Sequence, residues 1–225
     1  GSNPLLNTVQ DWVDSHVIGR ISKVQIWTNR PVWPQGIKMP KSDPSAKPKD
    51  LDWNLWLGPA PNKPYTPNMH PFNWRGWWDY GTGALGDVGC HLIDIPYRTL
   101  GLKYPKDAEC SVGTVYSGMF TQAYIPEGCP PSSFTTLHFD GTEKSKSPVE
   151  MTWSDGGIRP SHPEIIPAND DIGGPGSGNG VLMIGEKGII STNINDSEPL
   201  MPKLYLNDGT TEFGPEIEPN DEPEY

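Results

Sequence analysis

Asp87 and His91 stand four residues apart in a predicted helix, a spacing at which two side chains can exchange a proton with one bound ligand. On a helix that turns about 100° per residue, they share one face with Asp94 and Arg98, all within roughly 40°. An imidazole titrates near neutral pH, so His91 could move a proton while Asp87 orients it or the ligand. A solvated helix face would carry similar residues, and the wheel alone leaves both interpretations open.

The residues before this helix favour a binding site. The run GTGALG at 81–86 would let the backbone approach a ligand closely where the helix begins. An aromatic segment precedes it, whose rings could stack on a sugar and whose polar members could hydrogen-bond its hydroxyl groups. These candidate substrate contacts are Trp74, Arg75, Trp77, Trp78, Asp79 and Tyr80. Core packing is the alternative role for the tryptophans, and we expect at least half of them to have it.

Three further candidates lie in loops that could reach the same cleft, namely Arg30, Arg159 and His162. Cys90 falls within the helix and is predicted to be a small buried hydrophobe. Pro96 lacks a backbone N–H, so the helix is expected to kink or break there and to restart with Asp94 as its cap.

Periodicity predicts the elements that position these residues. A short amphipathic helix is predicted at 5–16, a helical turn within 51–58, and a long Trp- and Pro-rich loop from 29 to about 80. The predicted strands are 20–28, 107–117, 133–139, 147–154, 180–184, 188–193 and 203–206. We therefore expect an α+β fold with an open, predominantly antiparallel sheet and helices on one face. The other face would need a cover, which favours a homo-oligomer formed through it.

Composition limits the possible functions. The net charge of −11 argues against binding to nucleic acid or to an anionic membrane surface. No apolar run approaches the ~18 residues of a membrane span. The three cysteines form no C-x-x-C, so no disulfide framework and no metal site are predicted. The glycine-rich run 173–180 lacks the Lys-Ser/Thr and the helix of a phosphate loop, and no dinucleotide fingerprint follows a strand.

The ends of the chain suggest a piece of a longer protein. Gly1-Ser2 is expected to be a cloning remnant, residues 3–213 one domain, and residues 214–225 an acidic tail. The compartment stays open between a bacterial cytoplasm and periplasm.

Three segments resemble a known family. Residues 17–37 (VIGRISKVQIWTNRPVWPQGI), 51–61 (LDWNLWLGPAP) and 70–94 (HPFNWRGWWDYGTGALGDVGCHLID) are similar to the C-terminal domain of Gfo/Idh/MocA oxidoreductases. The match is to the bacterial subgroup with a long Trp- and Pro-rich insertion, and the resemblance covers most of residues 5–194.

The resemblance implies an enzyme whose N-terminal Rossmann domain binds NAD or NADP and which moves a hydride on a sugar, glycoside or polyol. The family's D-x-x-x-H motif is Asp87-Val88-Gly89-Cys90-His91 here. The resemblance implies that His91 is the acid/base and that Asp87 orients His91 or the substrate. The third catalytic group of the family is a Lys in an E-K-P motif of the Rossmann domain, which this sequence lacks. This chain would then bind no cofactor and would be inactive alone. The alternative is a non-catalytic carbohydrate-binding or oligomerisation module.

Overall fold

The computed structural model describes residues 5–173, 178–192 and 202–214. Its helical elements are α1 (Leu5–Asp14), η1 (Pro44–Ala46), α2 (Trp53–Leu57), η2 (Asn73–Gly76), α3 (Gly83–Leu92) and α4 (Asp94–Thr99). Its strands are β1 (Ile21–Trp27), β2 (Asp107–Val112), β3 (Tyr116–Gly118), β4 (Thr121–Gln122), β5 (Ser133–Phe139), β6 (Val149–Ser154), β7 (Gly180–Gly185), β8 (Gly188–Thr192), β9 (Lys203–Leu206) and β10 (Thr211–Phe213). The predicted acidic tail lies, apart from Gly214, outside the described residues.

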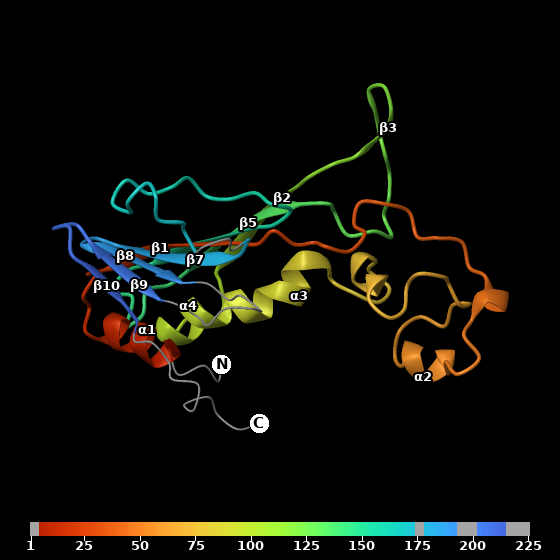
Figure 1. Cartoon of the computed structure of the whole chain (residues 1–225), viewed down its shortest axis with the longest axis horizontal. Helices are drawn as coiled ribbons and strands as arrows, with labels where there is room; N and C mark the ends of the chain where they lie inside the picture. The colour runs from red at the N-terminus through yellow and green to blue at the C-terminus, as the bar shows by residue number, and fades with distance from the viewer. Residues whose placement is uncertain (1–4, 174–177, 193–201, 215–225) are drawn as a thin grey trace.

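Eight of the described strands form one open sheet, in the order β10-β9-β8-β7-β1-β6-β5-β2. All neighbours in it are antiparallel except β1 and β6, which run parallel. Helices α1, α3 and α4 lie along one face of the sheet (Figure 1). The expected α+β fold with an open, mostly antiparallel sheet and helices on one face is confirmed.

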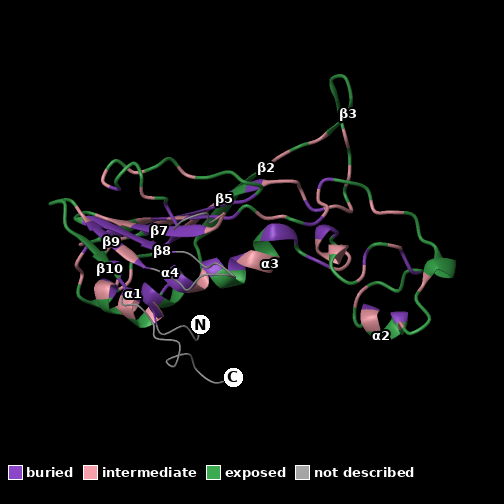
Figure 2. Ribbon diagram, viewed as in Figure 1, coloured by how far each residue is buried: buried purple, intermediate pink, exposed green. Residues whose placement is uncertain are grey.

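The main core lies between the helices and this face (Figure 2). Alternate strand residues point toward the helices because successive side chains leave a strand on opposite sides. Val24, Met151 and Trp153 from the central strands are buried there with Val9 of α1 and Leu92 of α3. Burial of each such side chain contributes about 1.5–3 kcal/mol, so this layer fixes α3 against the sheet.

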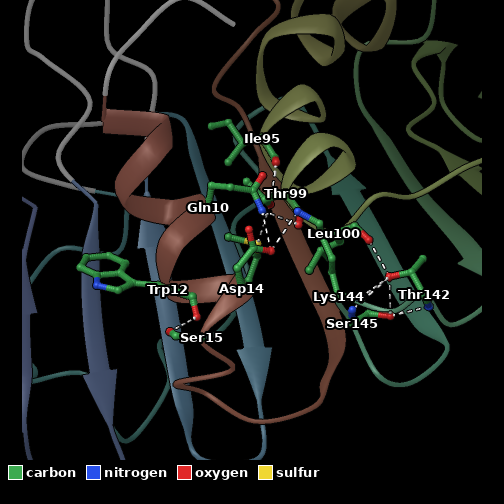
Figure 3. A network of polar contacts seen from close by, with 11 residues as sticks. Gln10, Trp12, Asp14, Ser15, Ile95, Thr99, Leu100, Thr142, Lys144 and Ser145 are labelled. Atoms are coloured by element: carbon green, nitrogen blue, oxygen red, sulfur yellow. Dashed lines mark hydrogen bonds and ion pairs between the residues drawn. The ribbon is translucent and has the colours of Figure 1, made fainter.

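Polar contacts join α1 to the end of α4 and to the loop after β5 (Figure 3). Gln10 donates from Nε2 to the carbonyl oxygen of Thr99 at 3.3 Å. Asp14 forms an ion pair with Lys144 at 2.9 Å. Thr142 donates from Oγ1 to the carbonyl of Leu100 at 2.6 Å, which satisfies one of the last carbonyl groups of the α3–α4 region.

The opposite face of the sheet is covered in part by the chain itself. Ile166 and Ile172, from the loop at 155–173, pack with Trp27, Leu182 and Ile189 in a second core. Beyond this core, the face over β6, β5 and β2 carries a cross-strand row of polar side chains that includes Glu150, His138 and Asp107. The expectation that an apolar face would need a partner as cover was therefore wrong for these strands.

The central helix breaks as Pro96 predicts, although the cap differs. The N-cap of α4 is Ile93, and Asp94 is its first residue. Pro96 then lies in the first turn, where its missing N–H costs no hydrogen bond. Cys90 is exposed, so the prediction that it is buried was wrong; Cys129 is the buried thiol.

The long loop folds back on itself around its aromatic residues. Asp52 caps α2 by accepting from the backbone N–H groups of Asn54 and Leu55, at 3.1 Å each. Trp53 and Trp56 stack with ring centroids 4.5 Å apart. The predicted helical turn and its packed tryptophans are confirmed. No helix in the described part of the chain is long and apolar enough to cross a membrane.

The second core is stabilised by a partly buried carboxylate whose charge can be removed. Asp170 accepts from Lys203 Nζ at 2.7 Å and from Tyr205 Oη at 2.8 Å. The hydrogen bond from Lys203 lowers the pKa of Asp170 most, with a smaller effect from Tyr205. A lowered pKa stabilises the fold above the carboxyl's ordinary pKa, about 3.9, and this stabilisation is lost as the pH falls through the lower folded-state value.

Asp170→Asn is therefore expected to lower the free energy of unfolding at pH 7 by about 1–2 kcal/mol. The difference from wild type should shrink as the pH falls below about 4. Urea denaturation measures both effects. Asp171→Asn is the matched control, because Asp171 is half exposed and 3.7 Å from Arg159. Equal losses in the two variants would contradict this account.

Candidate active site

Helix α3 begins at a glycine that the backbone requires. Gly83 has φ of +63°, a conformation that side chains other than glycine rarely adopt. A Cβ on Gly83 would also lie 3.0 Å from Cβ of Cys129 and 3.2 Å from Oε1 of Gln35. The chain therefore turns tightly into the helix, and this turn brings Asp87 next to the aromatic loop.

Asp87 is held by Arg75. Nε of Arg75 donates to Oδ1 of Asp87 at 2.7 Å, and both side chains are partly buried, with 24% and 30% exposed. Arg75 belongs to η2, which lies against α3, so the ion pair joins the loop to the helix. Within the described residues, Oδ2 of Asp87 has no hydrogen-bond partner and is available to a ligand.

The guanidinium group of Arg75 lies among three aromatic rings. Its Cζ is 4.5 Å from the ring centroid of Trp74, 4.7 Å from that of Phe72 and 5.8 Å from that of Trp33. Nη1 also donates to the carbonyl of Phe72 at 3.1 Å. Cation–π contacts of this kind contribute about 0.5–2 kcal/mol each, so the rings fix the orientation in which Arg75 meets Asp87.

His91 lies one turn after Asp87 and is exposed. Its imidazole makes no hydrogen bond to the part of the chain that the structure describes, and Asp87 does not orient it directly, because the carboxylate is turned to Arg75. The predicted common face is therefore present, with an exposed imidazole and a carboxylate that is fixed through one oxygen. Asp94 and Arg98 follow on α4.

The aromatic residues before α3 have different environments. Trp77 is buried and donates from Nε1 to the carbonyl of Ile37 at 3.2 Å, so its ring belongs to the core. Trp74 packs on Arg75, whereas Trp78 is 52% exposed. Of the three tryptophans, Trp78 thus offers the largest open surface to a ligand.

The last two residues of the aromatic segment contact the loop. Asp79 forms an ion pair with Lys63. Tyr80 packs edge-on against Trp56, with ring centroids 5.5 Å apart, and burial raises the pKa of its phenol. The Tyr80 hydroxyl is buried without a hydrogen-bond partner among the described residues, which makes it a polar atom that a ligand or water could satisfy.

The three further candidates from loops lie away from α3. Cζ of Arg159 lies 5.9 Å from the ring centroid of Trp27, and Nη2 donates to the carbonyl of Ile172 at 3.1 Å. Arg159 therefore packs on the far face of the sheet. His162 contacts the carbonyl of Asp170 at 2.9 Å in the same region. Arg30 accepts a backbone hydrogen bond from Gly156, at the start of that loop.

An apolar cavity of about 670 Å³ adjoins the first turn of α3. Its walls include Trp78, Leu85, Val112 and Ile125. Cys129 also lines it, and burial raises the pKa of this thiol to about 11, so the thiol stays neutral at physiological pH. Asp87 and His91 are not among the lining residues, and the cavity and the polar face therefore occupy successive turns of the helix.

Several residues that complete this region carry no signal in the sequence. Trp33 and Phe72 surround Arg75, and Lys63 pairs with Asp79, yet none has a spacing that relates it to α3. Only the folded loop brings them there. Among the described residues, no group of three or more His, Cys, Asp or Glu side chains could hold a metal ion.

Comparison with known proteins finds a family model that matches about half of the chain. Residues 5–113 match the model described as oxidoreductase family, C-terminal alpha/beta domain. No curated protein matches the sequence.

Several solved structures are similar to the whole chain. They include an oxidoreductase from Sinorhizobium meliloti (13% identity, TM-score 0.45, 94% of this chain and 40% of that one). An inositol dehydrogenase homologue from Azotobacter vinelandii, complexed with NADH and myo-inositol, shows 16% identity and a TM-score of 0.44, over 93% of this chain and 38% of that one. A super-repressor mutant of Gal80p from Saccharomyces cerevisiae shows 12% identity and a TM-score of 0.49, over 94% and 45%. The chain thus spans less than half the length of each.

The coupling between Arg75 and Asp87 can be measured with a double-mutant cycle. Arg75→Met and Asp87→Asn, singly and together, should give a coupling of about 1 kcal/mol in the free energy of unfolding, because the pair is partly buried and its geometry is fixed by rings. The pair Lys106–Asp140 is the control, with side chains 56% and 75% exposed, and its cycle should give no measurable coupling because solvent screens the pair. Additive losses at Arg75 and Asp87 would show that the ion pair does not join loop and helix.

Proposed function

Because residues 5–113 belong to the C-terminal α/β domain of the Gfo/Idh/MocA oxidoreductase family, we propose that this chain is the substrate-binding half of an NAD(P)-dependent oxidoreductase. Its substrate is a sugar, glycoside or polyol, and the reaction interconverts a hydroxyl and a keto group. The observation that carries the proposal is the exposed His91 one turn after a carboxylate that Arg75 holds through a single oxygen.

The proposed roles follow from the chemistry of alcohol oxidation. A carbon that loses a hydride must also lose the proton of its hydroxyl group, and an imidazole that titrates near neutrality can accept that proton. His91 has this role. Asp87 accepts a hydrogen bond from a substrate hydroxyl through Oδ2, while Oδ1 stays on Arg75.

The surroundings of this face suit a carbohydrate. The exposed ring of Trp78 can stack on the apolar side of a sugar ring, and the carboxylate of Asp87 can accept from a hydroxyl. Arg75 acts indirectly. The aromatic rings around its guanidinium group fix its position, and its ion pair then holds Asp87 in place. Trp77 has no part in stacking, since its ring is in the core.

The described residues do not fit a dinucleotide cofactor. Their parallel strand pair is β1 with β6, and β1 is followed by a loop rather than by a glycine-rich turn and a helix. In the proposal a separate Rossmann domain binds NAD or NADP, which takes up or supplies the hydride, and this domain also contributes a catalytic lysine. The chain alone would then be inactive. Self-association through the polar part of the open sheet face belongs to the same proposal.

The role of His91 can be tested in the full-length enzyme with its Rossmann domain. His91→Ala should lower kcat/KM by roughly 10²–10⁴, the usual contribution of a general acid/base. His138→Ala is the control, because His138 lies on the far face of the sheet beside Asp107. An undiminished kcat/KM in His91→Ala would exclude His91 as the acid/base.

A binding module without catalysis predicts a different outcome. Isothermal calorimetry would then show sugars binding to this chain without nucleotide, and the full-length protein would bind them without turnover. Under the proposed function, sugar binding depends on the Rossmann domain and is accompanied by reduction or oxidation of the nucleotide.

A further inference from the structure

Residues 113–128 form an arm that leaves the body of the protein. The chain continues from the edge strand β2 into β3, turns at Met119 and Phe120, and returns through β4 (Figure 1). The two strands of the arm pair Tyr116 with Gln122 and Gly118 with Thr121, and below them the backbone N–H of Ala123 donates to the carbonyl of Val115 at 2.8 Å. An isolated two-stranded hairpin is marginally stable at best in water, so the arm needs a surface to pack against.

The tip of the arm is apolar and fully exposed. Met119 is 87% and Phe120 94% exposed, and Tyr116 and Tyr124 on the same arm are 66% and 83% exposed. Large apolar side chains that gather on a projecting segment mark a contact with another molecule. Figure 2 shows the arm exposed along most of its length.

The arm also carries no charge beyond Glu127 at its base. Residues 113–126 contain no Asp, Glu, Lys or Arg, although the chain carries a net charge of −11. Charged side chains are the usual protection of exposed strands against pairing with other chains. Two copies of this protein can therefore bring their arms together without the repulsion that the rest of the surface would cause.

A cavity that fits the tip lies at the base of the same arm. The cavity of about 670 Å³ has Val115, Ala123 and Ile125 of the arm on one side and Leu85 and Trp78 on the other. Its size is sufficient for two large side chains, since pockets of roughly 300–1,000 Å³ enclose small organic ligands. Met119 and Phe120 are exposed and are not among the residues that line the cavity, so the tip does not fill the cavity of its own chain.

From these features we infer that two copies of the chain exchange arms, so that Met119 and Phe120 of each copy fill the cavity at the base of the other's arm. The residues from Gly113 to Met119 span about 20 Å when extended, at about 3.3 Å per residue. Two arms that lie antiparallel across a twofold axis place each tip at the other's base, which gives a closed, self-complementary contact.

The size of the surface agrees with a stable dimer. The arm and the cavity walls outside it amount to roughly 30 residues, and one side of a standard interface uses about 20–30. The cavity wall includes Gly83 and Gly86 of α3, so the partner's tip would lie beside the turn that precedes Asp87. This contact is separate from the open sheet face and does not depend on chemistry at His91, and the partner's tip would share the side chain of Trp78 with the proposed sugar site.

Analytical ultracentrifugation of the full 225-residue chain tests the exchange. The variant M119S/F120S should weaken dimerisation at least tenfold relative to wild type. The variant L55S/Y104S is the control, because Leu55 and Tyr104 are 81% and 93% exposed and lie outside the arm. A wild-type chain that stays monomeric, or a tip variant with an unchanged dissociation constant, would overturn the inference.

A thiol introduced at the tip distinguishes the cavity from any other dimer contact. Cys110 is exposed and lines the cavity, so M119C should form a disulfide with Cys110 of a second copy under a mild oxidant. Peptide mapping identifies this bond. M119C/C110S should lose it, and L55C should not form a bond to Cys110. If M119C gives no disulfide to Cys110, the tip does not enter the cavity and the inference is wrong.

Discussion

The ion pair between Arg75 and Asp87 is the contact on which the candidate site depends. It joins a loop of irregular structure to the helix that carries His91. Three aromatic rings hold the guanidinium, so the loop's tryptophans act on the site largely through Arg75. A partly buried charge needs an opposite charge nearby, and Arg75 and Asp87 provide this for each other. The loop thus stabilises one oxygen of Asp87 and leaves the other for a ligand.

The two faces of the sheet serve different purposes. The helix face buries the main core and fixes α3 and α4, with the break before Pro96 turning the second helix toward α1. The far face is covered by the chain's own loop on one side, through Ile166 and Ile172, and is polar on the other. Arg159 and His162 belong to that cover. The candidate site on α3 and the loop that covers the second core therefore lie on opposite faces of the sheet.

The arm at 113–128 gives the protein a second kind of surface. Its strands are too short to be stable alone, its tip is apolar, residues 113–126 carry no charged side chain, and the cavity at its base adjoins the first turn of α3. A partner's tip in this cavity would pack against the glycine-rich turn that precedes Asp87. Assembly and the geometry of the candidate site would then be coupled through one turn of helix.

The sequence by itself determined the elements, because periodicity and turn residues act over a few neighbours. It predicted seven of the eight strands of the main sheet and missed β10, and it predicted the helix with Asp87 and His91 on one face and the break near Pro96. It continued β2 to residue 117, since alternation does not reveal where a strand leaves a sheet, and it placed Cys90 in the core. Only the tertiary structure decided that Asp87 pairs with Arg75, that Trp77 is core while Trp78 is open, and that Trp33 contacts Arg75. These contacts join residues far apart in the chain, and their partners are fixed by packing of the whole loop rather than by local pattern.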